Sequence, residues 1–238
     1  AKIFCQYYDI TDGGNWEGTS IPHLILKKDS ICNILKISEE ELTHSLEKSR
    51  QIVKQHRSLR IPPGTDDKII VSWNGLMIST LAKASYVLGK PEYFEAASKS
   101  TSFILGRMSK EDGTLYRTCR NDLAHIDAFA EDYSFFGNSL IDMYESSFDP
   151  FFLEQSKRFA DILVENFLDK GNFRQSLSKN IIINQRNSMD NATPSYNFMC
   201  CLLLIRLYFY FNVKKYKEIV EKTMQNHGKL IKKYPFAH

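Results

Sequence analysis

The sequence predicts an all-α fold, an (α/α) toroid in which helical hairpins form an inner and an outer ring of helices. Two observations lead to this expectation. A pattern recurs at a spacing of roughly 60 residues, which is enough chain for one helical hairpin. Within each repeat, a more continuously apolar segment is followed by a segment that mixes apolar and charged residues at helical spacing.

The repeat is seen most clearly when Pro91 is placed on Pro150. Pro91-Glu-Tyr-Phe-Glu95 then aligns with Pro150-Phe-Phe-Leu-Glu154, and a glycine-containing turn follows in both copies. A third and weaker copy begins near Lys214. Residues 61–238 are therefore expected to form about three hairpins of a toroid.

The two helices of each hairpin are expected to occupy different rings. The mixed segments predict outer helices with one face in water, and the apolar segments predict inner helices. The outer helices are expected at 91–108, 150–167 and 214–233, and the inner helices at 75–88, 129–146 and 194–211. A six-hairpin barrel needs about twelve helices and about seven are predicted here, so the barrel is expected to be incomplete.

The first 60 residues are interpreted as a lead-in segment and a helix of the same domain. Residues 1–35 lack helical periodicity and are expected to be loop and short extended structure. Ser38, followed by three glutamates, predicts the start of a helix that continues to about His56. Because the chain begins directly in an apolar and aromatic run, we expect it to be part of a longer polypeptide.

Composition excludes several classes of function. The net charge of +3 arises from 31 basic and 28 acidic residues that are interspersed, which gives no reason to expect a nucleic-acid partner. The five cysteines have no zinc-type spacing, so no metal or other cofactor is expected. With no long apolar run and no signal peptide, the chain is expected to be soluble, not membrane-bound, and cytoplasmic.

Polar and aromatic residues precede each predicted inner helix. Successive inner helices should run parallel, because one antiparallel outer helix separates each from the next, so these segments should meet at one rim. Helix N-termini there would favour polar ligand atoms. We expect a pocket for a small sugar-like ligand, bound by Trp73, Asn74, Tyr133, Asp190, Ser195 and Asn197.

Acidic residues and one histidine near this rim are the candidate catalytic groups. Glu131 and Asp132 are neighbours on a helix and point about 100° apart, so a second acid such as Asp67 or Asp190 would have to complete a glycosidase pair. An epimerase would need acid and base groups on opposite faces of the sugar ring, for which His125 is the nearby histidine.

Structural roles are open for the same residues. Ser72, Asn74 or Ser195 can cap helices, and Trp73 can fill the core. Glu131 and Asp132 can stabilise a helix N-terminus without any catalysis. His125 can be an incidental loop residue.

Four blocks resemble the helical C-terminal region of a family of thioredoxin-domain-containing proteins, of which a spermatogenesis-associated protein is the animal member. The blocks are Gly14-Asn-Trp-Glu-Gly18, Asp66-Asp-Lys-Ile-Ile-Val-Ser-Trp-Asn-Gly-Leu-Met77, Ala128-Phe-Ala-Glu-Asp-Tyr133 and Asp190-Asn-Ala-Thr-Pro-Ser-Tyr-Asn197. They lie in the family's order between about residues 4 and 211. One departure is Tyr196, where the family usually has glycine.

The resemblance implies a six-hairpin toroid similar to the N-acylglucosamine 2-epimerases and six-hairpin glycosidases. It also implies a preceding thioredoxin-like domain of the same longer polypeptide, with its own paired cysteines. The expected function is a carbohydrate-active domain of the sugar epimerase or glycosidase type, which is an analogy by fold. The alternative is a non-catalytic interaction or regulatory module that works with the thioredoxin-like domain.

Overall fold

The computed structural model describes residues 1–178 and 188–235. The chain divides into two compact units, Ala1–Asp66 and Asp67–His238. Each unit has its own cluster of buried side chains.

The first unit consists of α1 (Lys2–Tyr7), α2 (Lys28–Leu35) and α3 (Glu39–Ser58). The prediction of loop for all of residues 1–35 was wrong for the two short helices, which are too short to establish a periodic pattern. Tertiary packing explains them, because Tyr7 and Ile31 are buried against Leu42 and Leu46 of α3. The predicted start of α3 is confirmed: the Ser38 hydroxyl accepts a hydrogen bond from the Glu41 N–H, and the Glu41 carboxylate accepts one from the Ser38 N–H.

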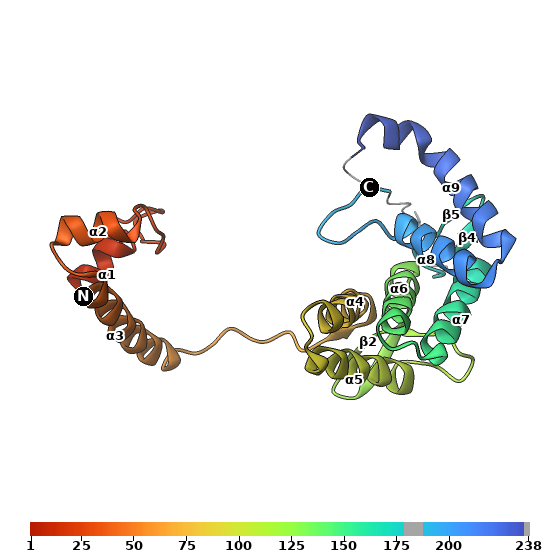
Figure 1. Ribbon diagram of the computed structural model, residues 1–238, viewed down its shortest axis with the longest axis horizontal. Coiled ribbons are helices and arrows are strands. Elements are labelled where there is room, and N and C mark those ends of the chain that lie inside the picture. Colours follow the sequence, from red (N-terminus) through yellow and green to blue (C-terminus); the bar gives the residue numbers. More distant parts are fainter. Residues whose placement is uncertain (179–187, 236–238) are drawn as a thin grey trace. The chain divides into compact units, whose positions relative to one another are not determined.

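The second unit contains three helical hairpins within its described residues. They are α4 (Val71–Val87) with α5 (Pro91–Arg107), α6 (Ala130–Ser147) with α7 (Pro150–Phe167), and α8 (Tyr196–Phe211) with α9 (Lys214–Lys233). Pro91 and Pro150 both lie in the first turn of an outer helix, where a missing N–H is harmless. In Figure 1 the helices α5, α7 and α9 lie outside α4, α6 and α8, which confirms the predicted inner and outer sets.

The three inner helices run parallel, as expected. Contacts between α4 and α6 join Ser72 to Asp132 near the start of both helices and Ser79 to Asp142 further along. Between α6 and α8, Asn138 donates to the Met199 carbonyl, and Arg206 pairs with Asp142 one turn later. Because both series advance in the same direction, the N-terminal ends of the inner helices lie toward one rim.

Glycine allows α4 to approach α6 closely. A Cβ on Gly75 would lie 2.8 Å from the backbone carbonyl carbon of Phe135 and from the backbone nitrogen of Phe136. Such contacts cannot be relieved by a side-chain rotation, so the α4–α6 packing depends on the absence of a side chain at position 75.

Short strands connect the hairpins. β1 (Ile69–Ile70), β2 (Tyr116–Arg120) and β3 (Leu123–Asp127) form an antiparallel sheet, and β4 (Leu168–Asp169) pairs with β5 (Asn172–Phe173). Residues 123–127, just before α6, pair in register with β2, so His125 lies on a strand and not in a loop. The turn Asn121-Asp122 has positive φ at both residues, which is the geometry that a two-residue hairpin needs.

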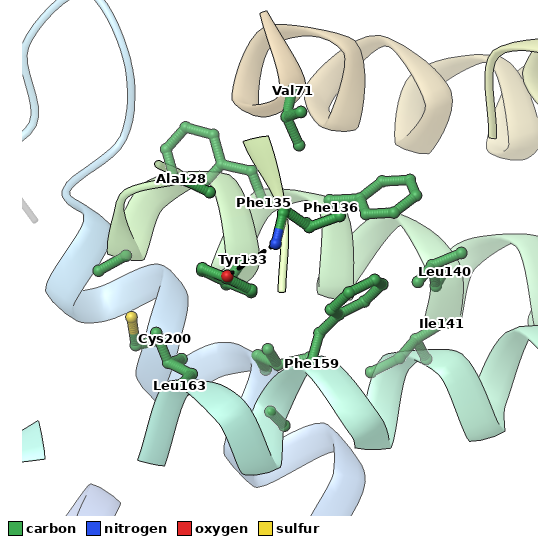
Figure 2. Close-up of a cluster of buried hydrophobic side chains, with 14 of the residues drawn as sticks. Val71, Ala128, Tyr133, Phe135, Phe136, Leu140, Ile141, Phe159, Leu163 and Cys200 are labelled. Carbon is green, nitrogen blue, oxygen red and sulfur yellow. Dashed lines mark hydrogen bonds between the residues drawn. The ribbon is translucent and has the colours of Figure 1, made fainter. Parts of the chain in front are cut away.

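The core of the second unit lies between the inner and outer helices. Figure 2 shows Phe135, Phe136 and Leu140 of α6 beside Phe159 and Leu163 of α7. In the parts of the chain that the structure describes, no helix is long and apolar enough to cross a membrane. Within residues 1–178 and 188–235, no three His, Cys, Asp or Glu side chains are grouped as metal ligands.

Candidate functional site

Asp132 connects several elements of the predicted rim. It is fully buried in the first turn of α6. Its Oδ1 accepts a hydrogen bond from the Ser72 N–H (3.0 Å), and its Oδ2 accepts one from the Phe129 N–H (2.8 Å). Burial raises the pKa of Asp132 to about 6, while the neighbouring Arg117 opposes this shift. These contacts make Asp132 a link between the first turns of α4 and α6.

Arg117 is a rim residue that the sequence analysis missed. It lies on β2, and its Nη1 is 2.9 Å from Asp132 Oδ2 and 2.6 Å from Glu131 Oε1. Its guanidinium also lies 4.4 Å from the centre of the Phe129 ring. A hairpin signal from Asn121-Asp122 could have shown that this arginine folds back toward the start of α6.

Glu131 and Trp73 are predicted rim residues at the α4–α6 junction, and both have access to solvent. The Glu131 side chain is 18% exposed and pairs with Arg117. Trp73 lies in the first turn of α4, next to Ser72, and is 61% exposed. The Ser72–Asp132 hydrogen bond thus brings the first turns that carry Trp73 and Glu131 together. Asn74 is half-buried and donates to the carbonyl of Ile70, the residue that precedes α4.

Asp67 and His125 belong to the sheet region. Asp67 pairs with Arg120 at the far end of β2, at 2.6 Å, and both side chains are about half exposed. His125 is exposed on β3, where its Nδ1 lies 3.3 Å from the Leu123 carbonyl and its Nε2 lies 3.4 Å from Thr118 Oγ1. No described contact joins either residue to Asp132, so the structure does not bring the four predicted catalytic groups into one cluster.

The predicted site residues before and in α8 make hydrogen bonds to nearby backbone groups. Asp190 accepts a hydrogen bond from the Ser195 N–H at 2.8 Å. Asn197 is fully buried and its side-chain oxygen accepts from the Phe173 N–H of β5 at 2.9 Å. Ser195 is also buried. This third segment therefore anchors the start of α8 and the β4–β5 hairpin.

Tyr133 lies in the hydrophobic core and not in the predicted rim pocket. It is 3% exposed and packs against Phe159 and Phe167 of α7 (Figure 2 shows Tyr133 and Phe159). Its hydroxyl accepts a hydrogen bond from the Leu115 N–H at 2.9 Å. Its ring points toward the outer helix and away from the face of α6 that carries Glu131.

A second charged cluster, not predicted from the sequence, joins the three inner helices further along their length. Asp142 is 1% exposed; its Oδ1 lies 2.6 Å from Arg206 of α8, and its Oδ2 lies 3.2 Å from Lys83 of α4. Arg206 also pairs with Glu145 at 3.0 Å. Positions 131, 138, 142 and 145 share one face of α6, so this cluster continues the face that begins at Glu131.

Sequence comparison finds relatives of this chain among known proteins. No family model matches the chain. It is 31% identical to spermatogenesis-associated protein 20 of Rattus norvegicus over 87% of its own length, and 26% identical to the Homo sapiens protein over the same share. The chain is homologous to spermatogenesis-associated protein 20. An uncharacterized protein of Caenorhabditis elegans is 24% identical over 99% of this chain. The chain spans about a third of the length of these relatives: 29% of the human and rat spermatogenesis-associated protein 20 sequences and 35% of the worm protein.

Solved structures confirm the fold of this homologue. A D-mannose isomerase matches with a TM-score of 0.55 and 14% identity, over 67% of this chain and 40% of that chain. A GH76 alpha-mannanase from Bacteroides thetaiotaomicron matches with a TM-score of 0.55 and 19% identity, over 70% and 47%. The cellobiose 2-epimerase from Spirochaeta thermophila gives 0.55 and 13%, over 67% and 43%. The described hairpins are thus those of an (α/α) toroid and correspond to less than half of each solved chain.

Proposed function

We propose that the second unit is part of a carbohydrate-active domain, of the sugar epimerase or glycosidase type, whose ligand binds at the N-terminal rim of the inner helices. The observation that carries the proposal is the junction of α4 and α6. There, an exposed indole and a solvent-accessible carboxylate arise from first turns that a buried hydrogen bond holds together. Aromatic surface beside charged groups is the composition of a sugar site.

In this proposal the rim residues have different roles. Trp73 offers a flat apolar surface for one face of a sugar ring. Glu131 is the acid or base, because it has solvent access whereas Asp132, the other carboxylate at the α4–α6 junction, is fully buried. Asp132 and Arg117 position Glu131, since Arg117 contacts both carboxylates. The fold similarity to an isomerase, epimerases and a mannanase supports a sugar as the ligand, although fold alone does not assign the reaction.

The test is a binding titration of the full chain with glucose, mannose, cellobiose and mannobiose. Isothermal calorimetry of wild type, Trp73→Ala and Glu131→Gln would measure affinity. We expect Trp73→Ala to weaken binding about tenfold, since a stacked aromatic ring contributes on the order of 1 kcal/mol or more. Trp16→Ala is the control, because Trp16 is also 61% exposed but belongs to the first unit. Binding that is equally affected by both tryptophan variants would contradict the proposal.

A second candidate function is favoured by the hydrogen bonds of Asp132, which occupy both of its carboxylate oxygens. Both of its carboxylate oxygens accept backbone hydrogen bonds, and one also contacts Arg117. A rim acid used in this way stabilises the fold and does not need a substrate. The alternative is therefore a non-catalytic interaction module that works with a thioredoxin-like domain of the same polypeptide. If the longer protein neither bound nor turned over any of these sugars, this second candidate would be preferred.

A further inference from the structure

A cavity of about 440 Å³ lies beside the β2–β3 hairpin, and none of the proposed rim groups Trp73, Glu131 or Asp132 lines it. Its walls come from the 110–115 turn, the end of β3, the start of α6, and residues 176–178 after β5; we call it the hairpin pocket. Tyr133 and Phe167 form its buried end. The volume is within the range of about 300–1,000 Å³ that is usual for small-molecule sites.

The hairpin pocket combines apolar walls with hydroxyl groups. Leu115, Phe129 and Leu177 supply apolar surface, and Thr114, Ser176 and Ser178 supply hydroxyls. This mixture suits a ligand that has both C–H faces and hydroxyl groups.

One wall residue has an unusual backbone conformation. Ile126 has φ of 64° although it is β-branched, and it lies within a strand whose pairing with β2 stays in register on both sides. A β-branched residue in this region is strained, and such strain is concentrated at binding sites and active sites. The conformation places a half-exposed isoleucine in the wall of the hairpin pocket.

The charges at the edge of the hairpin pocket already have partners. Lys110 pairs with Asp127 and lies 4.7 Å from the centre of the Tyr116 ring. Asp112 accepts hydrogen bonds from the N–H and the hydroxyl of Thr114. An ionic ligand would have to replace these contacts, whereas a neutral ligand would leave them in place.

We propose that the hairpin pocket binds a neutral mono- or disaccharide, at a position separate from the rim. The sugar's C–H surface packs against Ile126 and Leu177. Its hydroxyls donate hydrogen bonds to the Thr114 oxygen, which keeps its own bond to Asp112, and contact Ser176 and Ser178. The inference does not depend on the proposed rim function, because the two sites use different side chains.

Saturation-transfer NMR on the full chain tests this inference with the neutral sugars glucose, mannose, cellobiose and mannobiose, and with glucuronic acid as the charged comparison. We expect at least one neutral sugar to bind with a Kd of about 1 mM, and glucuronic acid to bind more weakly. Leu177→Lys removes apolar wall, and Leu202→Lys is its control, since the two leucines are 47% and 43% exposed and Leu202 lies on α8. Leu177→Lys should raise the Kd at least about fivefold, and Leu202→Lys should not.

A second variant guards against a folding artefact. Ile126→Gly also removes apolar wall, but glycine adopts positive φ without strain, so the variant should stay folded while its Kd rises. The proposal is overturned if no neutral sugar binds, or if Leu177→Lys and Ile126→Gly bind as wild type does. Sugar binding that is lost in Trp73→Ala and kept in both pocket variants would support the rim and refute the hairpin pocket, so the two sites can fail independently.

Discussion

The backbone nitrogen of Ser72 lies 3.0 Å from Oδ1 of Asp132 and donates a hydrogen bond to it across the boundary between α4 and α6. Replacing Asp132 with alanine leaves this donor and the Phe129 N–H without their acceptor, and it removes one of the two carboxylates that pair with Arg117. We expect Asp132→Ala to lower the free energy of unfolding by about 3 kcal/mol, because buried groups that lose a charged partner are costly. Chemical denaturation measures this loss.

The control for this variant is Asp149→Ala. Asp149 caps α7 through a single hydrogen bond to the Phe151 N–H in an exposed position, so its loss should cost about 1 kcal/mol. Equal losses for the two variants would show that Asp132 is only a helix cap.

The stability of the second unit should depend on pH through Asp132. Burial raises the pKa of this carboxyl from 3.8 in the unfolded chain to about 6 in the folded chain. Between these values the unfolded chain has released the proton and the folded chain has kept it. The free energy of unfolding therefore falls as pH rises from about 4 to about 6, by about 3 kcal/mol in total.

Urea unfolding at a series of pH values checks this prediction. Asp132→Asn cannot titrate at this position. The unfolding free energy of wild type should therefore fall relative to that of the variant as pH rises, and only across the same pH range. Parallel curves for wild type and Asp132→Asn would mean that the carboxyl titrates in the folded protein as it does in the unfolded chain.

Two helical glycines should respond in opposite ways to alanine. Gly75→Ala places a Cβ against the backbone of α6 and should destabilise the protein by about 2 kcal/mol or more. A Cβ on Gly106 of α5 meets no atom within 4 Å, so Gly106→Ala should stabilise it by about 0.5–1 kcal/mol. Thermal unfolding measures both changes in stability. Opposite signs for the two variants would support the close approach of α4 and α6 at Gly75.

Loss of Asp142 should lower the free energy of unfolding much more than loss of Lys83, because Asp142 is buried and Lys83 is exposed. Asp142→Leu leaves the Arg206 guanidinium without its buried carboxylate and should cost about 3–5 kcal/mol. Lys83→Ala removes a side chain that is 54% exposed and should cost under about 1 kcal/mol.

A double variant separates pairing from packing. Asp142→Leu combined with Arg206→Met should recover part of the Asp142→Leu loss, because it removes the guanidinium that has lost its buried partner. Additive losses in the double-mutant cycle would contradict the proposed coupling.

The hairpins could be predicted from the sequence because their signals are local. Pro91 and Pro150 begin two outer helices in register, and the apolar run from Phe198 to Phe211 lies within one inner helix. Parallel inner helices then follow from the alternation of inner and outer helices. The short helices α1 and α2 gave no such signal, because packing against α3 determines them.

The site was predicted less completely because its key contacts are not local. Arg117 reaches Glu131 only through the fold of the β2–β3 hairpin, and Asp142 meets Lys83 and Arg206 from three separate helices. Helical spacing does place Tyr133 near a rim, but the direction of its ring depends on the outer helix it packs against.

The central claim is that a sugar ring binds where α4 and α6 meet, and a crystal structure of the chain soaked with cellobiose or mannobiose tests it most directly. The account predicts electron density for a sugar ring stacked on Trp73, with a hydroxyl within hydrogen-bonding distance of Glu131. Density confined to other surfaces, with the Trp73 indole and the Glu131 carboxylate contacting only solvent, would contradict it.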